Sequence, residues 1–211
     1  MKVYFVRHGQ STFNADPFHN KTHQFPTTPL AEEGFAQAEK VAERFKSIPV
    51  DIIYTSSQTR ALQTAETINN VLQKKLVVAD LLIEKRTPTI LHGKDRNHPE
   101  AIEIKTLIKE HNNDPDWHYS DEENFFDFKA RGLKFIEELE AMPNENVLVV
   151  THGYIMILIA LLMVYGDDLT DSIFNPFIKF AHTTNTGITM MEYDKEKWRL
   201  LTWNDYSHLG E

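Results

Sequence analysis

The chain has 211 residues, of which 41% are hydrophobic and 25% charged, and its formal net charge at pH 7 is −9. This length and balance are typical of one globular domain that folds without disulfides or a structural metal. The chain has no cysteine, which excludes a disulfide scaffold, a thiolate zinc site and a cysteine nucleophile. The negative net charge argues against partnership with nucleic acid or an anionic membrane, because both require a basic face.

Two hydrophobic stretches resemble targeting or membrane segments. The apolar run 3–6 is too short for a signal peptide, and cleavage nearby would remove the polar residues that begin at Arg7. Residues 147–165 approach the length of a membrane span, but a Thr-His-Gly segment divides them into a short strand and a helix. The sequence therefore predicts a cytoplasmic protein without a membrane partner.

Strand and helix patterns alternate in the first part of the chain. Short apolar runs predict strands, and apolar residues at three- and four-residue spacing predict helices. In chain order these are a strand at 2–6, a helix at 31–47, a strand at 51–55, a helix at 58–73 and a strand at 76–79. Such alternation is typical of an α/β fold with a largely parallel sheet.

The alternation stops at a polar segment, about 86–128, that contains three prolines and a helical stretch near 99–111. We interpret this segment as an insertion into a single domain that spans 1–211. The elements predicted after it are a helix at 128–141, a strand at 146–150, a helix at 154–165 and a pair of strands at 187–193 and 197–203. The expected fold is a three-layer α/β/α sandwich with a mostly parallel sheet and a helical insertion over the active site.

Two of the predicted strands are followed by a histidine and a glycine. The first strand leads into Arg7-His8-Gly9, and the strand at 146–150 leads into Thr151-His152-Gly153. Ligands of open α/β sheets bind beyond the carboxyl ends of the strands, so the two segments are expected to face each other across one crevice. Each glycine would let the backbone approach a ligand closely, and the helix that follows His152 would direct free N–H groups at an anion.

Two other strand ends deliver an arginine and a carboxyl group. The strand at 51–55 leads to Arg60, and the strand at 76–79 leads to Glu84. A guanidinium binds a phosphoryl group through two parallel hydrogen bonds, and histidine can act as a nucleophile near neutral pH. A glutamate can protonate a leaving group. Together these residue types indicate phosphoryl transfer through a phosphohistidine.

The motifs around these residues resemble one known family. The segments are similar to the signature of the histidine phosphatase superfamily, which includes the phosphoglycerate mutases: RHGQSTFN at 7–14, PLAEEGFAQA at 29–38, YTSSQTRALQTA at 54–65, Glu84, VTHG at 150–153 and NTGIT at 185–189. The resemblance covers nearly the whole chain and is weakest over 87–120. The RHG tripeptide alone is unspecific, whereas its order and spacing with the second-arginine and second-histidine motifs are specific.

The resemblance implies a role for each residue of the set. His8 is expected to attack phosphorus in line and to become phosphorylated. Arg7, Arg60 and His152 are expected to hold the phosphoryl oxygens and to stabilise the charge of the transition state. Glu84 is expected to protonate the leaving oxygen and then to activate water. The resemblance implies no metal and no organic cofactor.

Further residues are candidates for substrate binding. The resemblance places Asn14 against the phosphoryl group or the substrate, and Gly153 directly precedes the predicted helix whose N–H groups could face an anion. Basic residues that follow Glu84 could recognise further anionic groups of the substrate, or they could simply be solvated: Lys85, Arg86, Lys94 and Arg96.

The sequence departs from the mutases after Glu84, where KRTPTILHGK replaces a stretch that contains Tyr-Gly. We therefore expect a phosphatase that acts on a small phosphorylated substrate or a phosphoprotein, as a monomer or homodimer. The alternatives are a phosphoglycerate-type mutase, a phospho-ligand binding module with vestigial activity, and a metallohydrolase.

Several other residues admit a second interpretation. Three glutamates of the insertion could replace Glu84 as the acid: Glu103, Glu122 and Glu123. His19 and His23 have the spacing of two metal ligands on a helix, but prolines on both sides predict a loop, which disfavours a metal site. Four aromatic residues are expected to form a core under the insertion, where one or two could line the pocket: Trp117, Phe125, Phe126 and Phe128.

Overall fold

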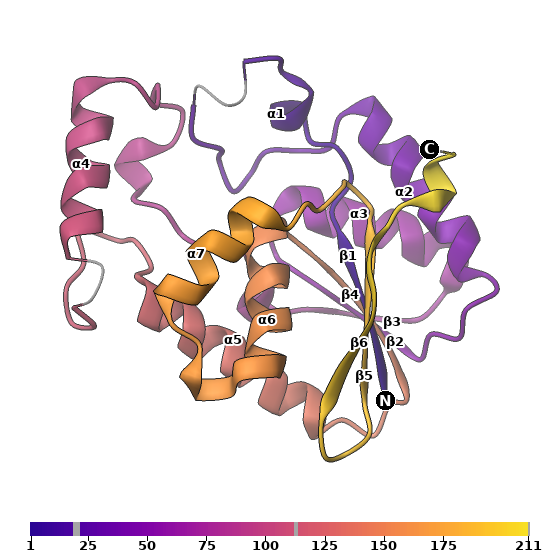
Figure 1. Ribbon diagram of the computed structural model, residues 1–211. Helices are drawn as coiled ribbons and strands as arrows, with labels where there is room; N and C mark the ends of the chain where they lie inside the picture. The colour runs from indigo at the N-terminus through magenta and orange to yellow at the C-terminus, as the bar shows by residue number, and fades with distance from the viewer. Residues whose placement is uncertain (19–21, 112–113, 211) are drawn as a thin grey trace.

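The sheet is the centre of the molecule (Figure 1). The computed structural model describes residues 1–18, 22–111 and 114–210. In this part of the chain six strands form one sheet in the order β3-β2-β4-β1-β5-β6. Their bounds are Lys2–Arg7 (β1), Ile52–Thr55 (β2), Lys75–Val78 (β3), Asn146–Thr151 (β4), Ile188–Tyr193 (β5) and Trp198–Asp205 (β6).

The sheet is mostly parallel, as the sequence predicts. Strands β3, β2, β4 and β1 pair in parallel, so their carboxyl ends lie at the same edge. Strands β5 and β6 form an antiparallel pair beside β1. Because Arg7 is paired with Thr151 at this edge, the two predicted histidine-glycine segments emerge side by side.

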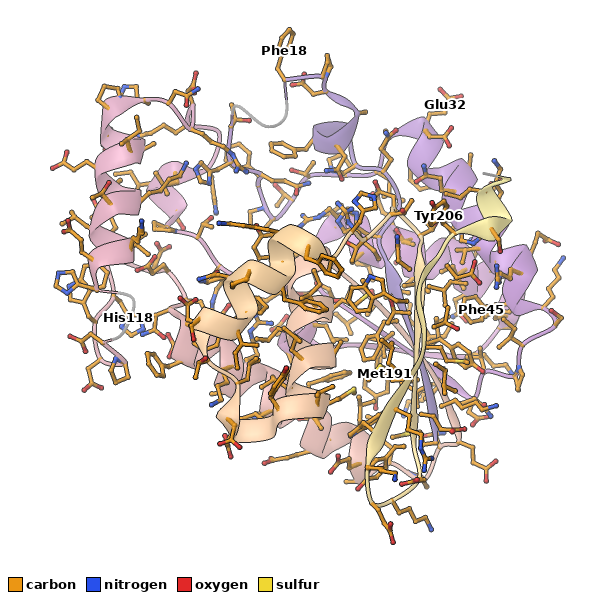
Figure 2. All side chains as sticks on the ribbon, viewed as in Figure 1. Phe18, Glu32, Phe45, His118, Met191 and Tyr206 are labelled. Atoms are coloured by element: carbon orange, nitrogen blue, oxygen red, sulfur yellow. The ribbon has the colours of Figure 1, made fainter. Side chains whose placement is uncertain are left out.

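Helices cover both faces of the sheet and complete the predicted three layers. On one face, α2 (Glu32–Phe45) and α3 (Thr59–Leu72) pack in a core that includes Phe45 (Figure 2). On the other face, α5 (Phe125–Glu140), α6 (Gly153–Tyr165) and α7 (Asp171–Phe180) pack in a core that includes Met191. Helix α6 is apolar on all sides because almost every side chain in it is buried. None of the described helices combines the length and apolarity that a bilayer crossing requires.

Two helices are not predicted by the sequence pattern. The short α1 (Thr12–Ala15) begins at Ser11, whose side chain accepts a hydrogen bond from the Asn14 backbone. Helix α7 contains Pro176, a residue that normally ends a helix. These elements are a single turn and a proline-containing segment, so neither carries a long uninterrupted periodic pattern.

The prediction that four aromatic residues form a core under the insertion is wrong in part. Phe125 and Phe128 belong to the main core, where both rings contact Phe174 of α7. Helix α5 begins at Phe125 instead of at residue 128, because Asn124 and Asp127 form a capping box. Trp117 stacks on His111, and Phe126 is 39% exposed.

The segment between η2 (Asp80–Leu82) and α5 has a small core of its own. It contains η3 (Thr89–Leu91) and α4 (Pro99–Glu110), and Leu91 packs there against Ala101 and Ile104. Figure 1 shows α4 to one side of the sheet, beyond the loop that follows α1. Isolated bridges join this loop to the segment, Thr22 to Asp95 and His23 to His92.

Candidate active site

His8 follows β1 and its position is fixed by the backbone. Its N–H donates to Thr151 O at 2.8 Å, and its carbonyl accepts from Asn185 Nδ2 at 2.8 Å. The imidazole is 3% exposed, and its Nδ1 lies 2.7 Å from Gly9 O. A carbonyl only accepts, so Nδ1 carries the proton and Nε2 keeps its lone pair.

The electrostatic surroundings of His8 favour the neutral ring. Burial lowers its pKa well below the usual value, and the charges of Arg60 and Arg7 lower this pKa further. The Nε2 atom therefore needs no deprotonation before it can act as a nucleophile at neutral pH. Arg60 Nε donates a hydrogen bond to this atom at 3.2 Å.

Gly9 has a different purpose from the one that the sequence suggests. A Cβ at Gly9 would lie 2.3 Å from Gly34 O, and a Cβ at Gly34 would lie 2.1 Å from Gln10 O. The two glycines thus allow α2 to pack directly on the backbone that follows His8. At Gly9 the close approach that requires glycine is an approach of helix α2.

Arg60 lies in the first turn of α3 and is 3% exposed. Its guanidinium contacts three partners: Nε donates to His8 Nε2, Nη2 to Gln58 Oε1 at 2.7 Å and Nη1 to Phe25 O at 3.5 Å. Burial lowers the pKa of Arg60 to about 10, which the nearby Glu84 carboxylate opposes. The group therefore remains a buried cation at neutral pH.

Arg7 is the last residue of β1 and also carries a buried guanidinium. Its Nη1 donates to Thr183 O, whereas its Nε has no hydrogen-bond partner among the described residues. Burial lowers the pKa of Arg7, and Glu84 again opposes the shift. A Cβ at Gly153 would lie only 3.8 Å from Arg7 Nε, so the start of α6 lies against this donor. A buried donor without a partner is costly unless a ligand satisfies it.

His152 is fully buried at the N-cap of α6. The centroids of the His8 and His152 rings are 5.1 Å apart. The Nε2 of His152 lies 2.8 Å from Ser56 Oγ, and its Nδ1 has no partner in the described structure. Burial lowers the pKa of His152 well below its usual value, and Arg60 lowers it further.

Glu84 reaches the same crevice from the segment after β3. Its Oε1 accepts from the backbone N–H of Ile155 at 3.1 Å and of Lys85 at 3.0 Å, and its Oε2 accepts from the N–H of Tyr154 at 3.2 Å. The carboxylate thus caps the free N–H groups of α6, where negative charge is favoured. The N–H groups expected to face a ligand are in part occupied by Glu84.

The glutamates proposed as rivals of Glu84 are placed elsewhere. Glu123 is 1% exposed, and both its oxygens accept from Arg131. Glu122 accepts from the backbone N–H of Tyr119. Glu103 is exposed on α4. Among these carboxyl groups Glu84 is the one whose charge acts on both Arg7 and Arg60.

The candidate substrate-binding residues differ in their contacts with other protein groups. Asn14 Oδ1 accepts from Ser11 Oγ at 2.9 Å, as part of the cap of α1. Lys85 lies among carboxylates: burial lowers its pKa, which Asp171 and then Glu122 raise. Arg86 is 57% exposed and lies 3.8 Å from Glu123.

The other basic residues of this segment contact protein groups. Lys94 forms an ion pair with Glu100, and Arg96 Nε donates to Thr22 O at 2.7 Å. A cavity of about 440 Å³ lies between Gln58 and Arg86, beside the Glu84 segment. Of the four basic residues considered, Arg86 lines this cavity.

The sequence reasoning missed residues that support the site. Ser56 contacts His152, Thr183 accepts from Arg7, and Asn185 holds the His8 carbonyl. Ser56 and Asn185 lie inside segments that carry the family resemblance, which is the signal that could have identified them. Thr183 acts through its backbone carbonyl, so its side chain gives no signal.

Of the two histidines considered as metal ligands, His23 lies within the described residues. His19 lies outside the described residues, and His23 is buried beside His92. Burial lowers the pKa of His23 to about 4, and the cations Arg96 and Lys105 contribute. In the described ranges there is no group of three or more side chains of the types that bind metals.

Comparison with known proteins agrees with this geometry. The family model "Histidine phosphatase superfamily (branch 1)" matches residues 3–206. The chain is 31% identical over 209 residues to "Putative phosphoserine phosphatase 2" of Hydrogenobacter thermophilus, covering 98% of this chain and 97% of that protein. It is 29% identical over 209 residues to "Uncharacterized phosphatase PhoE" of Bacillus subtilis, covering 99% of this chain and 96% of that protein.

A solved structure extends the likeness to the fold. The crystal structure of a putative alpha-ribazole-5'-P phosphatase from Escherichia coli superposes with a TM-score of 0.78 at 21% identity, covering 98% of this chain and 97% of the other. Family model, relative and fold agree over nearly the whole length. The chain therefore belongs to branch 1 of the histidine phosphatase superfamily.

Proposed function

We propose that the protein hydrolyses a phosphomonoester of a small metabolite through a phosphohistidine on His8. The observation that carries the proposal is the state of this ring: it is buried and neutral, and its Nε2 lone pair faces the Arg60 guanidinium. Two of the proteins compared above support a small substrate, because one is named a putative phosphoserine phosphatase and the other a putative alpha-ribazole-5'-P phosphatase. Among the described residues, the side chains of the crevice do not form a cluster of metal ligands.

In the first step His8 Nε2 attacks phosphorus while the bond from phosphorus to the ester oxygen breaks. Glu84, which must be protonated before this step, gives its proton to the leaving oxygen, so that the product is a neutral alcohol and Glu84 is left as a carboxylate. The Arg7 and Arg60 guanidiniums and His152 bind the phosphoryl oxygens, and the two unpartnered atoms, Arg7 Nε and His152 Nδ1, are available for these contacts.

In the second step water attacks the phosphorus of the phosphohistidine. The Glu84 carboxylate accepts a proton from this water, and the bond from phosphorus to Nε2 breaks, which returns His8 to its neutral form. Inorganic phosphate leaves and Glu84 is again protonated for the next cycle. We place Asn14 and Gly153 beside the phosphoryl group. Arg86 lines the adjoining cavity and Lys85 precedes it in the chain, so we place these two residues beside the rest of the substrate.

A mutase is the second candidate, because relatives named as probable phosphoglycerate mutases also match this chain. The phosphatase is favoured because the stretch after Glu84 lacks the Tyr-Gly of the mutases. Release of inorganic phosphate, without formation of an isomeric phosphoester, distinguishes the two. A cytoplasmic location and a monomeric or homodimeric state remain predictions from the sequence.

The test is direct detection of the phosphoenzyme. Brief incubation with a phosphodonor, followed by mass analysis without acid, should place phosphate on His8. His8→Ala should fold normally and lose turnover, because no other described imidazole has its Nε2 against Arg60. The matched control is His98→Ala, which removes an exposed histidine and should retain full turnover. Phosphate on Ser11, Thr12 or His152 would contradict the mechanism.

A further inference from the structure

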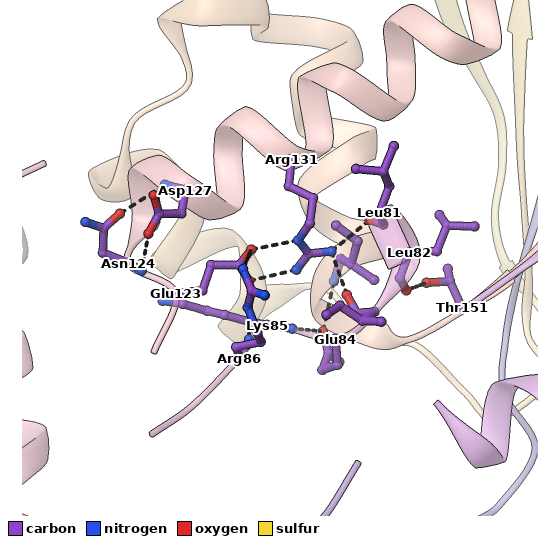
Figure 3. A network of polar contacts seen from close by, with 12 residues as sticks. Leu81, Leu82, Glu84, Lys85, Arg86, Glu123, Asn124, Asp127, Arg131 and Thr151 are labelled. Carbon is purple, nitrogen blue, oxygen red and sulfur yellow. Dashed lines mark hydrogen bonds and ion pairs between the residues drawn. The ribbon is translucent and has the colours of Figure 1, made fainter. Parts of the chain in front are cut away.

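A buried ion pair lies directly behind the segment that carries Glu84. The Glu123 side chain is 1% exposed and the Arg131 side chain 10%. Arg131 Nε donates to Glu123 Oε1 at 2.6 Å, and Arg131 Nη2 donates to Glu123 Oε2 at 2.7 Å (Figure 3). Neither residue has a part in the two chemical steps described above. Burying two charges is costly unless their remaining polar atoms also have hydrogen-bond partners. The other hydrogen bonds of the pair therefore indicate its role.

The pair contacts the backbone on the N-terminal side of Glu84. Arg131 Nη1 donates to Leu81 O at 2.7 Å and to Ile83 O at 2.8 Å. The carbonyl between them, that of Leu82, accepts from Thr151 Oγ1 at 2.7 Å. Three consecutive carbonyls before Glu84 are therefore held by side chains of α5 and β4.

The pair also contacts the backbone on the C-terminal side. Glu123 Oε2 accepts from the N–H of Arg86 at 3.3 Å, and the N–H of Glu123 donates to Arg86 O at 3.2 Å. Figure 3 shows the Glu84 segment passing between these two sets of contacts. Only Glu84 and Lys85 lie between the fixed peptides. After Leu82 the segment has no regular secondary structure up to Thr89, so side-chain contacts must determine its path.

We propose that Arg131 and Glu123 are positioning residues for Glu84: together they fix the peptides on both sides of it and so place its carboxyl at the leaving oxygen. This inference rests on the proposed function, in which Glu84 is the acid. An acid must lie within hydrogen-bond reach of the oxygen that it protonates, and a displacement of about 1 Å can cost about a hundredfold in rate. The ion pair is thus part of the proton-transfer geometry, and its Arg131 also lines the cavity beside the Glu84 segment.

The test uses leaving groups that differ in their need for a proton. An alkyl phosphate leaves as a strongly basic alkoxide, whereas a nitrophenyl phosphate leaves as a weakly basic phenolate. Arg131→Lys keeps the charge but cannot bridge Glu123 and two carbonyls at once. In single-turnover phosphorylation of His8, this variant should slow the alkyl ester by about tenfold to a hundredfold and the aryl ester by less than about threefold.

The same change in a Glu84→Gln background isolates the route of the effect. If Arg131 acts through Glu84, Arg131→Lys should add no further loss for the alkyl ester once Glu84 cannot transfer a proton. The matched control is Arg44→Lys, because Arg44 of α2 makes a comparable forked pair with Asp205 of β6, and neither element holds the Glu84 segment. This control should leave the ratio of alkyl to aryl rates at the parental value.

Each outcome decides the proposal. Equal losses on both esters, or a full additional loss in the Glu84→Gln background, would show that the pair supports the fold alone. If Arg131→Lys does not fold, Glu123→Gln is measured in the same way, since it keeps the shape of the side chain and the Arg131 contacts with the carbonyls; failure of both variants to fold also counts against the proposal. Absence of phosphate on His8 in the parent would instead reject the proposed function itself.

Discussion

The two histidines of the crevice have opposite ring contacts. In His8 the Nδ1 atom is hydrogen-bonded to Gly9 O and Nε2 accepts from Arg60 Nε. In His152 the Nε2 atom contacts Ser56 Oγ and Nδ1 has no partner among the described residues. Both rings are buried and have a lowered pKa, so both are neutral before a substrate binds. In the proposed mechanism these hydrogen bonds distinguish His8, the nucleophile, from His152, which contacts the phosphoryl oxygens.

At the same scale, Arg60→Lys should not be a mild change. Lysine keeps the charge but cannot contact His8 Nε2, Gln58 Oε1 and Phe25 O from one planar group. One charge-assisted hydrogen bond contributes about 1.5–3 kcal/mol, so kcat/KM should fall by about tenfold to a hundredfold or more. Steady-state kinetics measures the loss. Arg199→Lys, at an exposed ion pair with Asp194, is the control and should behave as the parent does; parental kinetics for Arg60→Lys would place Arg60 outside the site.

At the scale of elements, the site depends on how closely α2 approaches the end of β1. Gly9 and Gly34 each lack the Cβ that would collide with backbone of the other element. The N–H of Ala31, the N-cap of α2, donates to Gln10 O at 2.9 Å, and the N–H of Gly9 donates to Thr64 Oγ1 of α3 at 3.0 Å. Two helices therefore fix the turn that carries His8.

Gly34→Ala tests this contact. The new Cβ would lie 2.1 Å from Gln10 O, a backbone atom that cannot rotate away, so α2 must move. Overpacking of this kind costs about 1–3 kcal/mol, and we expect the free energy of unfolding and the turnover to fall together. Denaturant unfolding and kinetics of one preparation provide both values. Glu33→Ala, at an exposed position of the same helix, should stay within about 0.5 kcal/mol of the parent. Unchanged stability and turnover for Gly34→Ala would show that the contact is not required.

At the scale of the whole molecule, buried histidines couple folding to pH. Burial lowers the pKa of His8 and His152, and it lowers the pKa of His23 and of His208 to about 4. The ion pair with Asp127 has the opposite effect and raises the pKa of the exposed His118. In the unfolded chain all five would titrate near pH 6.5. As the pH falls, four of these histidines therefore make folding less favourable, whereas His118 makes it more favourable.

The free energy of unfolding should consequently fall as pH is lowered from about 6.5 toward 4, because the unfolded chain binds more protons than the folded chain in this interval. Denaturant titrations at several pH values measure the slope. His208→Gln should make it shallower, since His208 contributes one of these protons, and glutamine can still hydrogen-bond with Thr186 Oγ1 as the His208 ring does. A free energy of unfolding that is constant over this interval would contradict the expectation.

The sequence by itself determined the order of strands and helices and the residue types of the crevice. Periodicity identified the strands of the sheet and the long helices, because each buries one face, or in α6 every face, and its apolar residues repeat accordingly. The strand ends indicated Arg7, His8, Arg60, Glu84 and His152, since the carboxyl ends of parallel strands meet at one edge. These features are local in the chain and can be read locally.

Only the tertiary structure decided the hydrogen bonds, the protonation and the burial of these residues. The tautomer of His8 depends on Gly9 O and Arg60, its lowered pKa depends on burial by several elements, and the preference for Glu84 over Glu123 depends on Arg131 of α5. Gly9 faces a helix instead of a ligand because Gly34 lies against it. Such properties arise from groups far apart in the sequence, and no local pattern records a hydrogen bond between them or the loss of water around them.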